Sequence, residues 1–422
     1  VESFAGEGLR VLGAARRAVQ EVDLTSEADI VERGLEFLGV LAMHDPPRPE
    51  VEAAVRTCQR AGIRILMITG DYGVTAATIG RRIGVVSGDR TRIINGDELD
   101  RMNDSELASA LESEVVFARA TPEHKLRIVA SLQARNEVVA VTGDGVNDAP
   151  ALKKADIGVA MGLSGTDVAK EAADIILLDD NFASIVAAVE EGRAVYSNIR
   201  KFTTYVLTSN TPEAVPFVFF ALSGGRVPLA LGVMHILAID LGTDLVPALG
   251  LGAEPPEPGV MARPPRARTE HVIDRRLLAR AYLWLGPIQA GFVMLSFFFA
   301  FRLQGYDTTT GLPSSGSSYR AATAMALAAV VFTQIGNLFA QRSETGSVLR
   351  VGLGGNRMLW WGIGSELIVI GLIVYVPWLG DIIGTTAFPP LGWLWLLAGI
   401  PLLPLADEVR KAFVRYRSRR KM

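Results

Sequence analysis

Cysteine is almost absent from this sequence of 422 residues, which contains only Cys58. A single cysteine excludes an intrachain disulfide framework and a thiolate metal cluster. The sequence also has no excess of basic residues, because it contains 42 Lys and Arg and 45 Asp and Glu. We therefore expect no nucleic-acid partner held by a basic surface. The first 29 residues lack the continuous apolar run of a signal peptide. The glycine-rich Lys-Ser/Thr loop of P-loop nucleotide-binding proteins does not occur either.

Hydrophobic residues are distributed unevenly along the chain. Charged residues are frequent up to about residue 200, whereas the remainder contains long apolar runs. A helix that crosses a bilayer needs about 20 apolar residues. We predict six spans, at residues 202–223, 228–250, 277–301, 321–340, 358–379 and 391–409.

Basic residues mark alternate loops between these spans. Arginine and lysine gather before the first span, between the second and third, between the fourth and fifth, and after the last. Loops rich in Lys and Arg stay in the cytoplasm. The sequence therefore predicts a multi-pass membrane protein with both ends in the cytoplasm, and we expect it in the plasma membrane.

Short apolar runs alternate with amphipathic stretches over residues 35–180. We predict strands at 35–41, 64–68, 115–118, 138–141, 157–160 and 174–178, with helices between them. Strands alternating with helices are typical of a parallel sheet covered on both faces. The predicted fold is thus a Rossmann-type α/β domain followed by an all-α transmembrane bundle. Ligands of such sheets bind at the carboxyl ends of the strands.

Two polar strings end predicted strands in this region: Thr69-Gly70-Asp71 and Thr142-Gly143-Asp144-Gly145-Val146-Asn147-Asp148. Carboxylates beside glycines suit Mg²⁺ and a phosphoryl group, because Mg²⁺ prefers oxygen ligands and glycine lets the backbone approach. Lys125 can neutralise phosphoryl charge. Simpler alternatives are a plain Asp-Gly turn, a helix cap by Thr69 and a solvated surface lysine.

Ionisable and amide side chains also occur inside the predicted spans. Asn210 and Glu213 lie three residues apart on the first span, and Asp240, Thr243 and Asp244 share one face of the second. Two unit charges about 6 Å apart repel by roughly 3 kcal/mol at an effective dielectric of about 20. Asp240 and Asp244 therefore need a proton or a cation between them. The alternative is a polar cluster that satisfies only its own hydrogen bonds. His235 can relay protons or simply face a neighbouring helix.

Several ordered motifs resemble the P-type ATPases. They are Asp45-Pro46-Pro47-Arg48, Met67 to Asp71, Ala120 to Lys125 and Thr142 to Asp148, and the resemblance continues into the spans. The resemblance implies a haloacid-dehalogenase-like phosphorylation domain that uses Mg²⁺ and ATP. It divides the chain into a remnant of the nucleotide-binding domain (1–34), the phosphorylation domain (35–198) and a six-helix membrane domain with a basic tail (199–422).

The same resemblance assigns roles to individual residues. Thr69 and Lys125, with Gly70 and Asp71 beside the threonine, contact the phosphoryl group. Asp144 and Asp148 belong to the Mg²⁺ site, which Asn147 supports. Arg10 contacts nucleotide, whereas Asp45 and Arg48 belong to the hinge between cytoplasmic domains. The implied ligands of the transported cation are Asn210, Glu213, Asp240, Thr243, Asp244, Gln334, Asn337 and Glu366.

The ion-site strings are similar to type II pumps, and more to the sodium/potassium type than to the calcium type. A further sodium site of those pumps has a carboxylate where this chain has Asn337, although Glu366 matches that site's glutamate. Gln334 and Asn337 serve equally well as interhelical hydrogen-bond partners. The transported ion, its stoichiometry and any accessory subunit stay open.

Features of a complete pump are missing from this sequence. It has no Asp-Lys-Thr-Gly-Thr string for the phosphorylated aspartate, no Thr-Gly-Glu-Ser loop and no four preceding spans. We therefore expect the carboxy-terminal half of a pump, which needs its amino-terminal half and hydrolyses no ATP alone. The alternative is a naturally short, non-catalytic membrane subunit that binds or conducts cations.

Overall fold

A computed structural model describes residues 2–17, 33–88, 91–308, 311–344, 346–352 and 354–419. The chain forms two compact units. One contains residues 1–190 and 259–268, and the other contains residues 191–258 and 269–422. Part of the predicted 1–34 segment, residues 18–32, lies outside the described residues. The predicted boundary at residue 34 separates two strands that pair with each other. The two units divide after Glu190, eight residues before the boundary predicted at residue 198.

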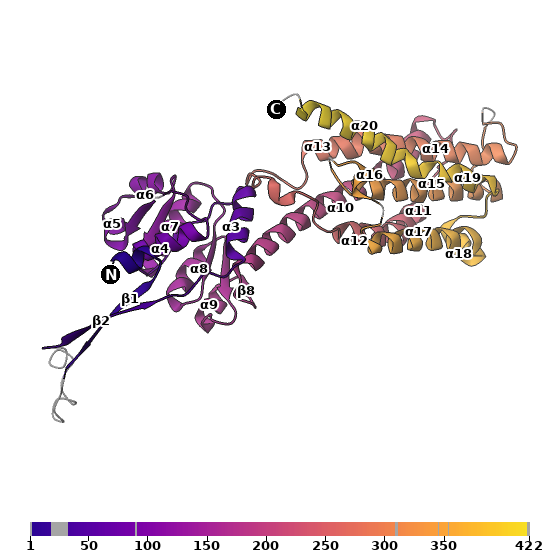
Figure 1. Ribbon diagram of the computed structural model, residues 1–422. Coiled ribbons are helices and arrows are strands. Elements are labelled where there is room, and N and C mark those ends of the chain that lie inside the picture. The colour runs from indigo at the N-terminus through magenta and orange to yellow at the C-terminus, as the bar shows by residue number, and fades with distance from the viewer. Residues whose placement is uncertain are drawn as a thin grey trace. The chain divides into compact units, whose positions relative to one another are not determined.

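The first unit contains two three-stranded parallel sheets (Figure 1). In one sheet the strand order is β3-β5-β4, and in the other it is β6-β7-β8. The middle strand β5 is completely buried, as both faces of a parallel sheet usually are. The strands are β3 (Met67–Ile68), β4 (Arg92–Asn95), β5 (Val115–Ala118), β6 (Ala140–Gly143), β7 (Ile157–Met161) and β8 (Ile175–Leu177).

Helices cover these sheets, and α6, α7 and α9 each begin at a side chain that caps the helix. Thr121 accepts a hydrogen bond from the backbone of His124 at the start of α7, and Asn103 forms a capping box with Glu106 at α6. Both caps satisfy backbone N–H groups that have no partner within the helix. The helices are α1 (Glu2–Gly6), α3 (Val51–Arg60), α4 (Gly73–Arg82), α5 (Gly96–Arg101), α6 (Asp104–Ala110), α7 (Pro122–Ala134), α8 (Ala149–Lys154) and α9 (Asp167–Ala172), with 3₁₀ turns η2 (Val146–Asp148) and η4 (Val260–Ala262).

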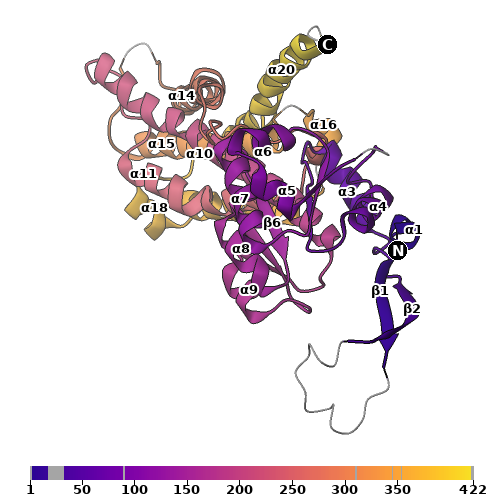
Figure 2. The same ribbon diagram turned by 90° about the vertical axis from the view of Figure 1, so that its left-hand side faces the viewer.

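The strand predicted at 35–41 is present, but the structure corrects the sheet to which it belongs. This segment forms β2 (Glu36–Met43), which pairs antiparallel with β1 (Arg10–Arg16) in a separate ribbon and joins neither parallel sheet (Figure 2). Its alternation with a following helix suggested a parallel strand, but the partner strand precedes it. β1 and β4 had no counterpart in the prediction. β4 is a four-residue edge strand that begins with Arg92, so its apolar core is too short to stand out.

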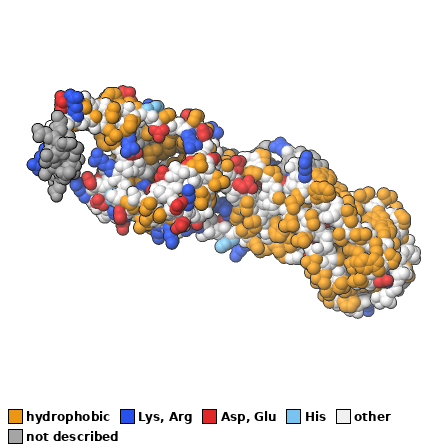
Figure 3. All heavy atoms as spheres, turned by 90° about the horizontal axis from the view of Figure 1, so that it is seen from below, with side chains coloured by type: hydrophobic (Ala, Val, Ile, Leu, Met, Phe, Trp, Pro, Cys, Tyr) orange, Lys and Arg blue, Asp and Glu red, His pale blue; other side chains and the backbone are white. Residues whose placement is uncertain are grey.

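The second unit is a helical bundle whose surface is largely hydrophobic, whereas charged side chains are spread over the first unit (Figure 3). Within the described residues, five helices are long and apolar enough to cross a membrane: Val233–Gly252, Arg275–Leu303, Ser317–Gln341, Arg357–Tyr375 and Leu391–Arg417. The first predicted span lies in α10 (Phe182–Leu222), which is helical there but does not meet the same criteria. Asn210, Pro212, Glu213 and Pro216 lower its hydropathy.

Two of these helices contain wide π-helical turns. In the span 233–252, η3 (Ala238–Thr243) lies between α11 (Val233–Leu237) and α12 (Leu245–Gly252). In the span 275–303, η5 (Ala279–Leu285) lies between α13 (Arg275–Leu278) and α14 (Gly286–Leu303). Such turns often occur at functional sites. The remaining helices are α15 (Ser317–Gln341), α16 (Val348–Val351), α17 (Arg357–Tyr375), α18 (Pro377–Ile383), α19 (Leu391–Leu397) and α20 (Gly399–Arg419).

Candidate functional site

The loop after β3 holds the first predicted phosphate-binding string in place. The backbone N–H of Thr69 donates to Phe117 in β5, and that of Ala120 donates back to Thr69. The Thr69 hydroxyl oxygen accepts from the Asp71 N–H at 3.1 Å. Thr69 therefore stabilises its own turn at the carboxyl end of the strand, while Gly70 and Asp71 remain exposed.

The loop after β6 is organised around the buried Asp148. Its Oδ2 accepts from the N–H groups of Asp144 and Gly145, at 3.3 and 3.1 Å. Gly143 leaves room for this carboxylate, because a Cβ on Gly143 would lie 2.6 Å from the Asp148 Cγ. The glycine is needed here for close packing. The side chains of Asp144 and Asn147 remain exposed beside it.

Lys125 meets this loop from the first turn of α7. Its ammonium forms an ion pair with the Asp148 Oδ1, and the two side chains are 19% and 9% exposed. Both Asp148 oxygens thus have partners, and Asp144 is the carboxylate left accessible to a cation. The described residues contain no group of three or more His, Cys, Asp or Glu side chains able to hold a metal. One carboxylate with water and phosphate is nevertheless a usual arrangement for Mg²⁺.

The predicted nucleotide and hinge residues lie apart from this pair. Arg10 is the exposed first residue of β1, on the ribbon. Asp45 and Arg48 follow β2, and the Arg48 guanidinium donates to the Asp179 carbonyl oxygen at 3.2 Å. Asp179 follows β8, so Arg48 fastens the end of the ribbon to the turn beyond the sheet.

The second predicted site lies at the π-helical turn η3. The backbone N–H of Asp244 donates to the carbonyl of Ile239, five residues earlier. The buried Asp244 carboxylate accepts from Gln334 Nε2 at 2.6 Å and from the Thr243 hydroxyl at 3.3 Å. Asp240, by contrast, is exposed. The wide turn thus carries one buried and one exposed carboxylate.

Amide side chains on one face of α15 continue this network. Asn337 Nδ2 donates to Gln334 Oε1 at 2.8 Å and to the Tyr205 carbonyl at 3.2 Å. The Tyr205 hydroxyl lies 3.2 Å from the buried Glu366 Oε1. Asp244, Gln334, Asn337 and Glu366 are therefore connected through shared partners. The interhelical hydrogen bonds predicted as an alternative for Gln334 and Asn337 are present.

The two predicted residues of α10 behave differently from each other. Glu213 is buried, and its Oε1 has no hydrogen-bond partner among the described residues. Asn210 donates to the Tyr282 hydroxyl on η5 at 3.2 Å. The hydrogen bonds therefore direct Asn210 to a different helix from the one that carries Asp240 and Asp244.

Sequence reasoning missed Tyr205 and Gln341 as members of this network. Gln341 Nε2 donates to Asn337 Oδ1 at 2.7 Å. The spacing of Gln334, Asn337 and Gln341 could have revealed that they share a helix face. No comparable signal identifies Tyr205, because its hydroxyl reaches Glu366 across 161 residues of sequence.

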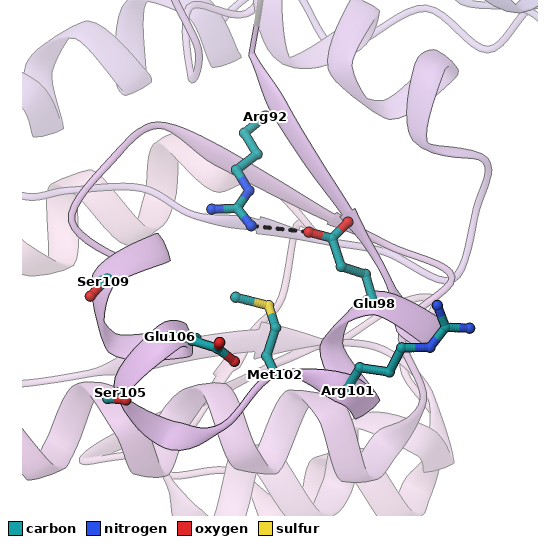
Figure 4. A pocket seen from close by; sticks show the side chains of 7 residues that line it. All are labelled: Arg92, Glu98, Arg101, Met102, Ser105, Glu106 and Ser109. Carbon is teal, nitrogen blue, oxygen red and sulfur yellow. Dashed lines mark hydrogen bonds and ion pairs between the residues drawn. The ribbon is translucent and has the colours of Figure 1, made fainter.

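A surface pocket of about 540 Å³ lies elsewhere in the first unit (Figure 4). It is formed by α5, α6 and β4, and an ion pair of 3.0 Å between Arg92 and Glu98 borders it. None of its lining residues belongs to the phosphate-binding strings, so it forms no part of either candidate site.

Comparison with known proteins defines the class of both units. Residues 4–156 match the haloacid dehalogenase-like hydrolase family, and residues 228–413 match the family "Cation transporting ATPase, C-terminus". The α/β fold predicted for the first unit is thereby confirmed, as is the helical membrane region that follows it.

Individual relatives agree with this class. The sodium/potassium-transporting ATPase subunit alpha-2 of Rattus norvegicus is 38% identical over 93% of this chain and 43% of its own length. The alpha-1 subunit of Oreochromis mossambicus is 36% identical over 98% of this chain and 46% of its own. The potassium-transporting ATPase alpha chain 2 of Oryctolagus cuniculus is 36% identical over 90% of this chain and 39% of its own length. The chain is thus similar to cation-transporting ATPases, and it spans less than half the length of these relatives.

Proposed function

We propose that the chain is the carboxy-terminal part of an ATP-driven cation pump that works through an aspartyl phosphate. One observation carries the proposal. The same chain combines a lysine–aspartate pair at the strand ends of a dehalogenase-like unit with a buried carboxylate–amide network on a π-helical turn. The first arrangement suits phosphoryl chemistry, and the second suits cation binding in a membrane.

The residues at the strand ends fit a phosphoryl group with Mg²⁺. Lys125 lies where it can neutralise phosphoryl charge, and the accessible Asp144 can bind the metal. Thr69 and the backbone of Gly70 line the neighbouring strand end, while Asp148 and Asn147 shape the loop. When bound, Mg²⁺ would offset the charge of the phosphate oxygens. ATP, with Arg10 as a contact, and the hinge role of Asp45 and Arg48 belong to the same proposal.

The two parallel sheets leave a place for the missing half of the pump. β3 and β6 are edge strands, and each ends in a phosphate-binding string. Residues of both sheets share one hydrophobic core, which includes Phe117 and Val139 with Ile68 and Val141 packed against it. A further parallel strand between β3 and β6 would join the sheets. By the family resemblance, the amino-terminal half brings the phosphorylated aspartate on such a strand.

The exposed position of Asp240 also supports the proposal that further helices of the pump pack against this chain. Asp240 lies within a helix apolar enough to cross a membrane, and a carboxylate facing lipid is costly. Helices of the amino-terminal half would cover it and complete the cation site. Asp240, Asp244, Thr243, Glu213, Asn210, Gln334, Asn337 and Glu366 are the proposed ligands or supports. The cation is sodium, potassium, a proton or calcium.

Phosphorylation would act on this site by changing its geometry between two states of different cation affinity. We place the pump in the plasma membrane with both ends of the chain in the cytoplasm, as the basic loops predict. The alternative of a passive membrane subunit is not favoured, because the phosphate-binding residues are retained and the relatives are transporting ATPases.

The test joins this chain to the missing half, supplied from the complete coding sequence. We expect cation-stimulated phosphorylation from ATP in the complete protein and no hydrolysis by this chain alone. Asp240→Asn and Asp244→Asn should each reduce the apparent affinity for the activating cation at least tenfold. Glu270→Gln removes an exposed acid outside the network and should leave it unchanged.

Two results would overturn the proposal. One is ATP hydrolysis by the purified chain alone, free of contaminating activity. The other is an unchanged cation affinity in both aspartate variants. Cation leakage from liposomes that contain only this chain would instead support the passive subunit.

A further inference from the structure

His235 caps the helix that carries the carboxylates of the candidate cation site. It is the third residue of α11, and its Nδ1 accepts a hydrogen bond of 2.8 Å from the backbone N–H of Gly232. This is the position that Glu or Gln occupies in a capping box. The helix continues from His235 through η3 to Asp240 and Asp244. The cap therefore fixes the start of the segment on which these carboxylates lie.

The geometry defines the protonation state that this cap requires. Because Nδ1 accepts a hydrogen bond, the neutral ring carries its proton on Nε2. His235 is 6% exposed, and its Nε2 has no hydrogen-bond partner among the described residues. The Nε2 lies near Gly384, 3.9 Å from the position that a Cβ on this glycine would take. The ring is thus buried against the turn that follows α18.

A second histidine cap in the chain shows what His235 lacks. The Nδ1 of His124 accepts from the N–H of Thr121 at 3.1 Å, in the same position of α7. Its Nε2, however, lies 2.7 Å from the Asp100 carboxylate. His235 has no such carboxylate on its Nε2 among the described residues.

The helices and loops around His235 carry charged side chains and several neutral polar groups. Arg320 of α15 donates to the carbonyls of Gly380 and Thr385 and pairs with Asp381 at 2.8 Å. The Tyr319 hydroxyl donates to the Leu229 carbonyl in the loop before α11. Other charged or titratable residues at this end of the bundle are Arg226 in the same loop, Arg302 at the end of α14, Tyr306 and Asp307 in the loop before α15, and Tyr375 on α17. Asp240 follows on the helix itself. Asp381 is already paired with Arg320, and the hydrogen bonds and ion pairs of the described residues give His235 no carboxylate partner.

We propose that His235 is a pH-sensitive positioning residue for the cation site. This inference rests on the proposed function of Asp240 and Asp244. Protonation of Nδ1 converts the acceptor into a donor, and the Gly232 N–H loses its partner. The buried imidazolium also faces a turn that already binds Arg320. Acid therefore releases the start of α11 and loosens the wide turn η3, which carries Asp240 and leads into Asp244. In the predicted orientation, this end of the helix faces the outside of the cell.

The first experiment follows the cap itself in the full chain in lipid nanodiscs. Amide hydrogen exchange of ¹⁵N-labelled Gly232, corrected for the intrinsic rate, is measured between pH 8 and pH 5. The wild-type protection should fall about fivefold, as expected for the loss of a helix cap. His235→Gln keeps an acceptor that does not titrate, so its protection should stay constant. His235→Leu should show, at both pH values, the lower protection that the wild type shows in acid. His271→Gln, at an exposed histidine, should follow the wild type.

The second experiment measures the cation affinity of the complete protein, with the amino-terminal half present, from its thermal stabilisation by Na⁺ or K⁺ at the same pH values. The wild type should lose about fivefold more affinity in acid than His235→Gln does. If no variant binds cations at any pH, the proposed function fails, whereas the exchange experiment still decides the role of His235. Identical pH profiles of Gly232 protection in the wild type and His235→Gln would overturn the inference.

Discussion

Lys125 and Asp148 form an ion pair between the first turn of α7 and the loop after β6. The pair joins two strings that lie 23 residues apart in sequence. Asp148 thereby holds the lysine beside the exposed Asp144, which remains accessible to a cation. One unit thus presents a positive and a negative group side by side.

Removal of Lys125 should change two affinities in opposite directions. In Lys125→Met, Mg²⁺ should bind several-fold more tightly, because a cation near the carboxylates is gone. Orthovanadate, a phosphate analogue, should bind about tenfold more weakly, since charge-assisted contacts contribute roughly 1.5–3 kcal/mol. Both affinities are accessible by calorimetry on the purified chain. Lys153→Met, at an exposed lysine of α8, is the control, and a parallel change in both affinities would contradict the assigned role.

Gly143 and Gly145 form a matched pair for testing the packing of this loop. A Cβ at residue 143 would lie 2.6 Å from the Asp148 Cγ, whereas one at residue 145 would lie 3.5 Å from its nearest neighbour, Asp148 Oδ2. Gly143→Ala should displace Asp148, weaken Mg²⁺ binding and destabilise the unit by about 1–3 kcal/mol. Gly145→Ala should have little effect. Equal thermal unfolding of the two variants would show that the loop adapts to the added methyl group.

The hydrogen bonds to Asp180 predict that the folded state around it becomes less stable in acid. Hydrogen bonds from the N–H groups of Leu163 and Ser164 lower the pKa of Asp180 to about 2. Because the pKa is lower in the folded state, the contribution is complete above about pH 4 and is lost as the pH falls towards 2. Amide exchange of Leu163 and Ser164 over this range measures the effect.

The matching variant for this measurement is Asp180→Asn. Asn tolerates the positive φ of 50° at this position, so the substitution removes mainly the charge. Its amide protection should be lower at neutral pH and independent of acid. Glu171→Gln should behave as the wild type, and a pH-dependent loss in Asp180→Asn would assign the effect to another group.

A buried carboxylate in the bundle holds three cations. Asp407 pairs with Arg280 at 2.7 Å, with Arg410 at 2.7 Å and with Lys411 at 3.0 Å. Asp407→Asn should destabilise the detergent-solubilised chain by about 3–5 kcal/mol, because the buried cations lose their counter-charge. Asp381→Asn breaks the exposed pair with Arg320 and should cost below about 1 kcal/mol. Similar unfolding temperatures for both variants would contradict this reasoning.

Much of the architecture could be predicted because its signals are local. The strand at 115–118 agrees with the structure to the residue, since its four apolar residues are all buried. The partner of β2 could not be predicted, because pairing between residues 10–16 and 36–43 depends on contacts across the chain. The span predicted within α10 is the one whose helix does not meet the criteria of length and hydropathy for crossing a membrane. Its polar residues lower hydropathy, although a helix forms there.

In the candidate sites too, residue types could be predicted from the sequence, whereas contacts between distant segments could not. The residue types of Lys125, Asp144 and Asp148 indicated phosphate chemistry, but the sequence could not show that Asp148 uses both oxygens within the protein. The role of Gln334 as donor to Asp244 depends on how two helices pack together. The exposed position of Asp240 likewise depends on which helices cover it.

The burial of α15 has a consequence for how the bundle is assembled. Every residue of its apolar window is buried by protein, and Gln334, Asn337 and Gln341 find their partners only inside the bundle. A helix entering lipid alone would expose these three amides to hydrocarbon. Its insertion therefore depends on neighbours, and α14, which precedes it and packs along it, is the first available. The order of synthesis thus favours entry of α14 and α15 into the bilayer together, as a helical hairpin. The polar face of α15 is then covered by helices that are synthesised before and after this hairpin.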